Sequence, residues 1–155
     1  MFKEIDDIYN YIGQEMYERL PEYWDIALLE VNMDKIDKAI SIGASYILNN
    51  TSNTFDLDEK NGVVSFSDVD EAFYALYKIM QKNESENDVP WNKARFEITS
   101  EGDFSIDFKY DEDFVWYKSL DIDSQEYDDL DIDIINQIET WEGLPETAPR
   151  YWKNK

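Results

Sequence analysis

Residues 94 to 110, "ARFEITSEGDFSIDFKY", are the stretch that decides the fold. Gly102 sits between two arms in which apolar and polar residues alternate. Alternation with a period of two is typical of strands that bury one face, and glycine suits the tight turn that joins two such strands. We therefore predict an antiparallel hairpin. The alternating residues are Phe96 and Ile98 on one arm, and Phe104, Ile106, Phe108 and Tyr110 on the other.

Two helices are expected before this hairpin. Residues 3–20 carry apolar side chains at spacings of three and four and stop at Pro21, the pattern of an amphipathic helix. Residues 68–82 repeat that pattern after Ser67, whose hydroxyl suits a helix N-cap. Each of these helices would pack one apolar face on a sheet.

Further strands are expected between and beside the helices. Residues 24–33 and 39–48 are rich in apolar and β-branched side chains and predict a strand pair. A third strand is expected in residues 54–58 or 62–66. The prediction is thus a single α+β domain over residues 1–155, with an antiparallel sheet of about five strands and helices packed on it.

The remainder of the chain is predicted to hold a third helix near residues 130–142, closing one edge of the sheet. After it, the two prolines and the glycine of residues 143–155 favour an irregular, docked segment.

Composition limits the classes of function. The 155 residues carry a net charge of -22, yet 43% are hydrophobic, which is enough to build a packed core. The negative charge opposes direct binding to nucleic acid or anionic lipid and favours fast association with a basic partner. The acidic N-terminus and the lack of a run of about 18 apolar residues predict a cytoplasmic protein without membrane contact.

The chain contains neither cysteine nor histidine. This excludes disulfides, Ser-His-Asp and Cys-His catalysis, and an ordinary structural zinc site. Only carboxylate chemistry is left for an enzyme, and with 36 acidic residues any carboxylate spacing arises by chance. We therefore expect a non-enzymatic protein that uses no cofactor.

Residues 111–134, "DEDFVWYKSLDIDSQEYDDLDIDI", hold ten carboxylates and one lysine, Lys118. Asp121, Asp123 and Gln125 match the first positions of an EF-hand loop, but Glu126 replaces its glycine and Ile132 its final glutamate. A specific calcium site is therefore not expected. A solvated face is the usual meaning of such a charge run.

The aromatic residues of this stretch favour a protein interface instead. Phe114 and Trp116 alternate with Val115 and Tyr117 as a continued strand would, and interfaces concentrate binding energy in aromatic anchors while charges steer the encounter. Tyr151 and Trp152 are either a second pair of anchors or a pair that packs on the domain and closes the fold. The predicted contact residues are Asp111, Glu112, Asp113, Trp116, Tyr117, Asp121, Asp123, Glu126, Tyr127, Asp128 and Asp129.

Four segments of the chain carry a family resemblance: "LPEYWDIALLEV" (20–31), "SDVDEAFYALYKIMQKN" (67–83), "PWNKARFEITSEGDFSIDFKYDED" (90–113) and "LPET" (144–147). Together they resemble the YezG-like family of bacterial immunity proteins, and the similarity spans most of the chain. The chain departs from the family pattern in the extended acidic stretch from Asp121 to Asp133.

The resemblance implies a small cytoplasmic antitoxin that binds the catalytic domain of a cognate secreted toxin, one to one, and blocks it. In this family the toxins are typically nucleases, delivered by type VII secretion or by contact-dependent inhibition systems in bacterial competition. The alternative is an acidic mimic of nucleic acid, or a regulatory module, that acts on a basic host protein. A carboxylate enzyme is the third interpretation.

Overall fold

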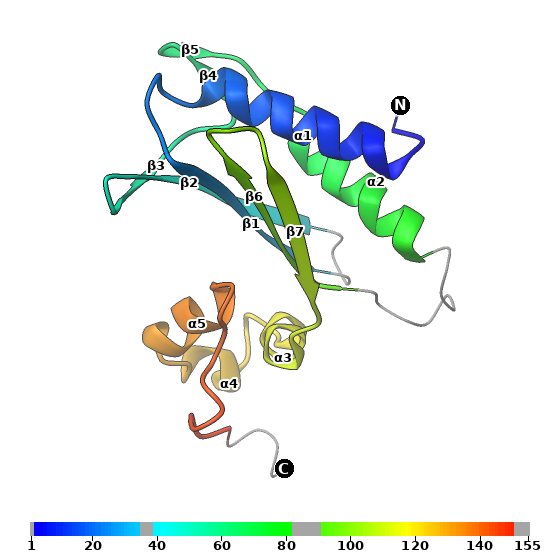
Figure 1. Ribbon diagram of the computed structural model, residues 1–155. Coiled ribbons are helices and arrows are strands. Elements are labelled where there is room, and N and C mark those ends of the chain that lie inside the picture. Colours follow the sequence, from blue (N-terminus) through cyan, green and yellow to red (C-terminus); the bar gives the residue numbers. More distant parts are fainter. Residues whose placement is uncertain (1, 35–38, 82–90, 151–155) are drawn as a thin grey trace. The chain divides into compact units, whose positions relative to one another are not determined.

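A computed structural model of the chain describes residues 2–34, 39–81 and 91–150 (Figure 1). The chain divides into two compact units, residues 1–110 and 111–155. The first unit combines a five-stranded antiparallel sheet with helices packed on it, so the predicted α+β class is confirmed. A single domain over residues 1–155 stays a prediction.

The sheet is built from five strands in the order β3-β2-β1-β6-β7. Each neighbouring pair is antiparallel, and β1 lies at the centre between β2 and β6. The predicted strand pair is confirmed. The strands are β1 (Ile26–Asp34), β2 (Ala39–Leu48), β3 (Thr51–Thr54), β6 (Lys93–Thr99) and β7 (Phe104–Lys109).

The hairpin predicted over residues 94–110 is the β6–β7 pair. Phe96 faces Ile106 and Ile98 faces Phe104 across the two strands, as the alternation requires. Gly102 has a φ of 99°, a left-handed conformation that side chains rarely adopt, and its N–H donates to the carbonyl of Thr99 at 3.0 Å. The turn therefore depends on glycine at this position.

Both predicted helices of the first unit are present and pack on one face of the sheet (Figure 1). They are α1 (Ile5–Arg19) and α2 (Val69–Gln81), and they contact each other. The carbonyl of Asp68 accepts from the N–H of Ala72 at 2.9 Å, so Asp68, one residue later than the predicted Ser67, directly precedes α2. The core includes Ile8, Ile12, Met16, Leu29, Val31, Phe73, Leu76, Trp91, Phe96 and Ile98.

The third strand lies earlier than either predicted segment. Asn49 and Asn50 both have positive φ, which closes a two-residue turn and starts β3 at once. The segment 62–66 instead belongs to a separate small hairpin of β4 (Glu59–Lys60) and β5 (Val63–Val64). Its turn is Asn61-Gly62, again with positive φ at both residues.

The second unit is helical. It holds α3 (Glu112–Ser119), α4 (Gln125–Asp128) and α5 (Ile132–Glu139), whereas residues 143–150 form neither helix nor strand. The predicted strand continuation through Phe114 and Trp116 is therefore wrong, while α5 confirms the helix expected near 130–142. Placement of α5 at an edge of the sheet stays a prediction. Among the described residues, no helix is long and apolar enough to cross a membrane.

The core position Phe73 gives a direct test of the packing between α2 and the sheet. Phe73 is fully buried, whereas Phe66 is 81% exposed. We expect Phe73→Ala to lower the free energy of unfolding by about 3 to 5 kcal/mol, because it removes buried apolar surface and leaves a cavity. Phe66→Ala should change it by less than about 0.5 kcal/mol. Urea denaturation of both variants measures the difference, and equal effects would contradict this core.

Candidate functional site

Each of the three short helices in the acidic stretch begins at a side-chain cap. Asp111 Oδ1 accepts from the N–H groups of Asp113 (2.9 Å) and Phe114 (3.4 Å) ahead of α3. Ser124 Oγ accepts from the N–H of Tyr127 at 3.2 Å. These bonds satisfy N–H groups that a helix start leaves without partners, and carboxylates there also favour the helix dipole. Part of the carboxylate density is therefore structural.

The repeated tetrapeptide "LDID" adopts the same turn in both copies. Asp121 Oδ1 accepts from the N–H of Asp123, and Asp131 Oδ1 accepts from the N–H of Asp133, each at 2.9 Å. The isoleucines inside the turns are exposed: Ile122 at 68% and Ile132 at 64%. Each copy thus presents one apolar side chain between carboxylates, and neither isoleucine is among the predicted contact residues.

The aromatic residues of the stretch form the small core of the second unit. Phe114 and Tyr117 are buried with Ile138 and Leu144, and Trp116 and Tyr127 pack against them half-buried. The rings of Tyr117 and Tyr127 stack, with centroids 6.4 Å apart and planes 12° apart. Tyr117, one of the predicted anchors, is only 8% exposed. These rings give the unit its core, and the exposed apolar side chains of the stretch are aliphatic.

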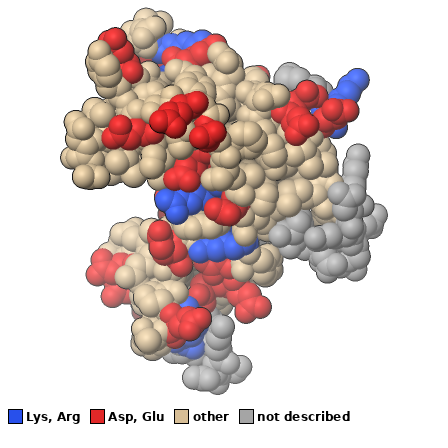
Figure 2. Space-filling model, viewed as in Figure 1, with Lys and Arg blue, Asp and Glu red and all other residues tan. Residues whose placement is uncertain are grey.

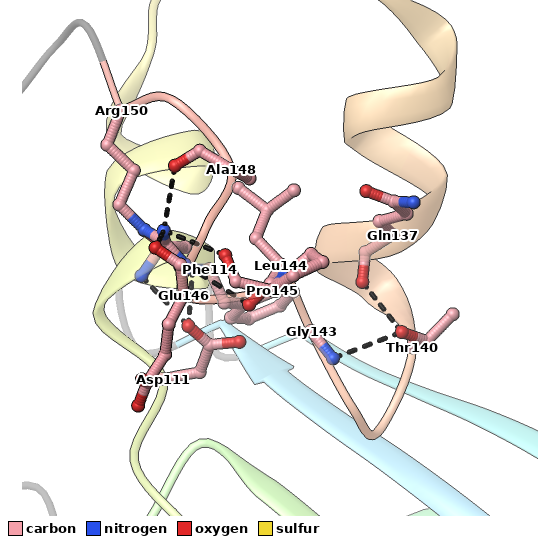
Figure 3. A network of polar contacts seen from close by, with 11 residues as sticks. Asp111, Phe114, Gln137, Thr140, Gly143, Leu144, Pro145, Glu146, Ala148 and Arg150 are labelled. Atoms are coloured by element: carbon pink, nitrogen blue, oxygen red, sulfur yellow. Dashed lines mark hydrogen bonds and ion pairs between the residues drawn. The ribbon is translucent and has the colours of Figure 1, made fainter.

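Arg150 holds the segment after α5 against α3 (Figure 3). Its Nε donates to Asp113 Oδ1 at 3.0 Å, and one Nη donates to Asp113 Oδ2 at 3.0 Å, a two-point pair that suits guanidinium and carboxylate geometry. The same side chain donates to the carbonyls of Leu144, Pro145, Glu146 and Ala148. Its bond to Asp113 raises the pKa of Arg150.

A second contact shapes the same segment. The hydroxyl of Thr140 donates to the carbonyl of Gln137 at 2.7 Å and accepts from the N–H of Gly143 at 3.1 Å (Figure 3). Gly143 has a φ of 70°, so the chain reverses direction at this point. The chain after α5 is therefore irregular but held by specific bonds, in agreement with the docked segment that the sequence predicts.

Four carboxylates around α4 are exposed: Asp121, Asp123, Asp128 and Asp129. We call them the α4 acidic surface. Lys118 lies over the rings of Phe114 and Tyr117, 5.8 and 5.2 Å from their centroids, and Arg150 is bound to Asp113. Figure 2 shows acidic side chains spread over the visible face of residues 111–150. The α4 acidic surface is thus open to a solvent-borne cation or a basic protein.

The predicted contact residues differ widely in exposure. Glu112 is exposed, Asp111 and Glu126 are half-buried, and Asp113 is buried in its bond with Arg150. Tyr151 and Trp152 lie outside the described residues. Within residues 111–150, the structure thus places the predicted set on one unit and separates it into an exposed acidic part and an internal aromatic part.

No group of three or more Asp and Glu side chains among the described residues is arranged to hold a metal ion. A scan of protein-family models finds no match to the chain, and a search of curated proteins finds none either. The resemblance to YezG-like immunity proteins therefore stays a prediction from the sequence.

If the bonds of Arg150 hold the segment after α5, one substitution at Arg150 should increase local opening there. Arg150→Ala removes the partner of a buried carboxylate and the donor to several carbonyls. We expect amide exchange at Phe114 and Ala148 to accelerate about tenfold or more, whereas exchange in β1 stays unchanged. Arg150→Lys should lose most of the protection, because lysine cannot form the two-point pair. Unchanged exchange in both variants would contradict this role.

Burial, together with Tyr127 and Glu139, raises the pKa of Tyr117 from 10.0 to about 12. The folded protein then keeps a proton that the unfolded chain loses above pH 10, so stability falls as pH rises from about 10 to 12. Denaturation at several pH values in this window should show a steeper decline for the wild type than for Tyr117→Phe. Parallel declines would contradict the shift.

Proposed function

We propose that the protein is a non-enzymatic, cytoplasmic immunity protein that binds the catalytic domain of a cognate nuclease toxin and blocks it. The α4 acidic surface is the observation that supports this most directly, since its four carboxylates are exposed. A nuclease must hold phosphates and therefore carries a basic cleft. Carboxylates on a folded scaffold can occupy such a cleft as the phosphates would.

Charge alone would give attraction without a fixed orientation. The exposed side chains of Ile122 and Ile132 supply apolar contacts within the acidic stretch. Desolvated apolar contacts surrounded by charges provide most of the binding energy in protein interfaces, while the charges raise the association rate. We therefore assign the toxin contact to the α4 acidic surface, with these two isoleucines as the apolar anchors.

The core of the second unit keeps this surface in one arrangement. Tyr117 of α3 and Tyr127 of α4 stack their rings, and the Arg150 network fixes the segment after α5. A rigid surface loses less entropy on binding than a mobile acidic tail would. Stoichiometric inhibition requires only such a preformed surface, and no catalytic side chain.

Reversal of the α4 acidic surface tests the proposal. We expect the four substitutions Asp121→Lys, Asp123→Lys, Asp128→Lys and Asp129→Lys, made together, to weaken binding to the toxin by about 100-fold or more, because they remove the carboxylates that pair with its basic residues. The Kd should then also vary less with salt concentration, because fewer ion pairs remain for salt to screen. The measurement is the Kd for the purified nuclease domain of the cognate toxin, which is first identified by its co-purification with this protein, and it is taken at several salt concentrations.

A matched control tests whether the location of the reversed charges matters, or only the change in net charge. It reverses four exposed carboxylates of the first unit and so changes the net charge by the same amount, through Asp7→Lys, Glu22→Lys, Glu101→Lys and Asp103→Lys. This control should bind within about threefold of the wild type. If both sets weaken binding equally, the contact is not local to α4. Tight binding of a host nucleic-acid-binding protein, with none to the toxin, would favour the nucleic-acid mimic instead.

A further inference from the structure

Half of strand β2 lacks a neighbour on one side. β1 pairs with β2 from Ala39 to Ile47, but on the other side β3 pairs only with Ser45 to Leu48. Among the described residues, no strand pairs with β2 between Ala39 and Ala44 on that side. An open strand edge of this kind is a template for another extended chain.

The backbone of this edge is correctly oriented for pairing. The N–H of Phe55 donates to the carbonyl of Ala44 at 3.2 Å, which shows that the polar groups of Ala44 point to the β3 side. In an antiparallel sheet these directions alternate along a strand, so Ile42 and Ile40 present their N–H and C=O groups on the same side. The open edge therefore offers two donors and two acceptors.

A cavity of about 920 Å³ lies along this edge. Its apolar lining includes Ile40, Ile42 and Ala44 of β2 together with Phe55 and Leu57, which leave the sheet where β3 ends. All five are half-buried, so their exposed parts form the floor. The space is large enough for the side chains that a guest strand would point toward the sheet.

The rim of the cavity is acidic. Asp56, Asp58 and Glu59 line one side and Asp70 the other, and Glu71 joins Asp70 beside Ile40 in an adjoining hollow of about 220 Å³. These five carboxylates are exposed. The one cation in the described lining, Arg19, is buried and bound to Glu15 and to the carbonyl of Ser65, the latter at 2.8 Å. The open charge is therefore negative.

The β4–β5 hairpin, which contributes Glu59 to the rim of the cavity, is held in place by bonds to its neighbours. Lys60 bonds Glu18 of α1 at 2.7 Å, and the N–H of Ser65 donates to the carbonyl of Asp58 at 2.7 Å. Beyond them the same hairpin presents Val63, Val64 and Phe66, which are 66%, 70% and 81% exposed. Neighbouring exposed apolar side chains of this kind mark protein contacts more often than small-molecule sites.

We propose that the open edge of β2, between Ala39 and Ala44, binds an extended basic segment of a protein partner as an added β-strand. Backbone bonds to Ile40 and Ile42 would align the segment, its apolar side chains would enter the cavity, and its lysine or arginine side chains would face the acidic rim. This site lies in the first unit, and it does not depend on the toxin contact assigned to the second.

A synthetic peptide tests the site without knowledge of the natural partner. The probe is an eight-residue peptide of alternating lysine and valine with blocked ends, long enough to span the open edge at about 3.4 Å per residue. Two reference peptides are used: one with glutamate in place of lysine, and one that keeps every lysine but replaces two valines by proline, which cannot pair as a strand.

Amide chemical shifts of the full chain measure the position and the affinity of the probe. We expect the lysine-valine peptide to shift the amides of Ile40 and Ile42, and the proline peptide to bind at least about tenfold more weakly. The glutamate peptide should not bind. Equal binding of the lysine-valine and proline peptides would overturn the proposal, because charge without strand pairing would then suffice.

Two matched variants locate the contact. Glu59→Lys with Glu71→Lys removes rim charge, and we expect it to weaken the lysine-valine peptide by about tenfold or more. Glu142→Lys with Glu146→Lys makes the same change of net charge in the second unit, outside the α4 acidic surface, and should leave the affinity within about twofold. Ile42→Pro, which removes a donor on the open side alone, should also abolish the shifts while thermal unfolding confirms its fold. If the pair in the second unit weakens binding as much as the rim pair, the proposal fails.

Discussion

The structure depends on the burial of apolar side chains, which must offset the electrostatic repulsion of a net charge of -22. The first unit meets it by packing α1 and α2 on one sheet face around Phe73, Trp91 and Phe96. The second unit has a smaller core, and it adds the pair of Arg150 and Asp113. Because carboxylates cannot enter either core without a partner, the excess charge remains on the surface.

The fold was predictable wherever a local period is long and uniform. The β6–β7 hairpin, β2 and both helices of the first unit follow the alternation or the three-four spacing of their residues. The four residues from Phe114 to Tyr117 are too few for their hydrophobic pattern to distinguish a strand from a turn of helix. The cap at Asp111 favours the helix. The short strand β3 lies earlier than predicted because its sequence, Thr51–Thr54, contains no apolar residue, so only the Asn49-Asn50 turn indicates where it begins.

The candidate site was predictable in its charge but not in its apolar part. The density of carboxylates in residues 111–134 is visible in the sequence, and the four carboxylates of the α4 acidic surface are exposed. Tertiary packing determines which hydrophobic side chains stay exposed to solvent. It buries Tyr117 and leaves Ile122 exposed. The bond from Arg150 to Asp113 joins residues 37 positions apart, and no local pattern reports such a contact.

The two units thus offer different chemistry to a partner: an acidic surface with aliphatic anchors in one, and an open strand edge with an acidic rim in the other. A titration of the protein into a cleavage assay of its proposed cognate nuclease measures inhibition by binding. If the two proteins bind one to one, we expect cleavage to fall linearly with added protein and to end at equimolar protein. Full cleavage in about tenfold excess of the protein, at concentrations well above any specific Kd, would contradict it.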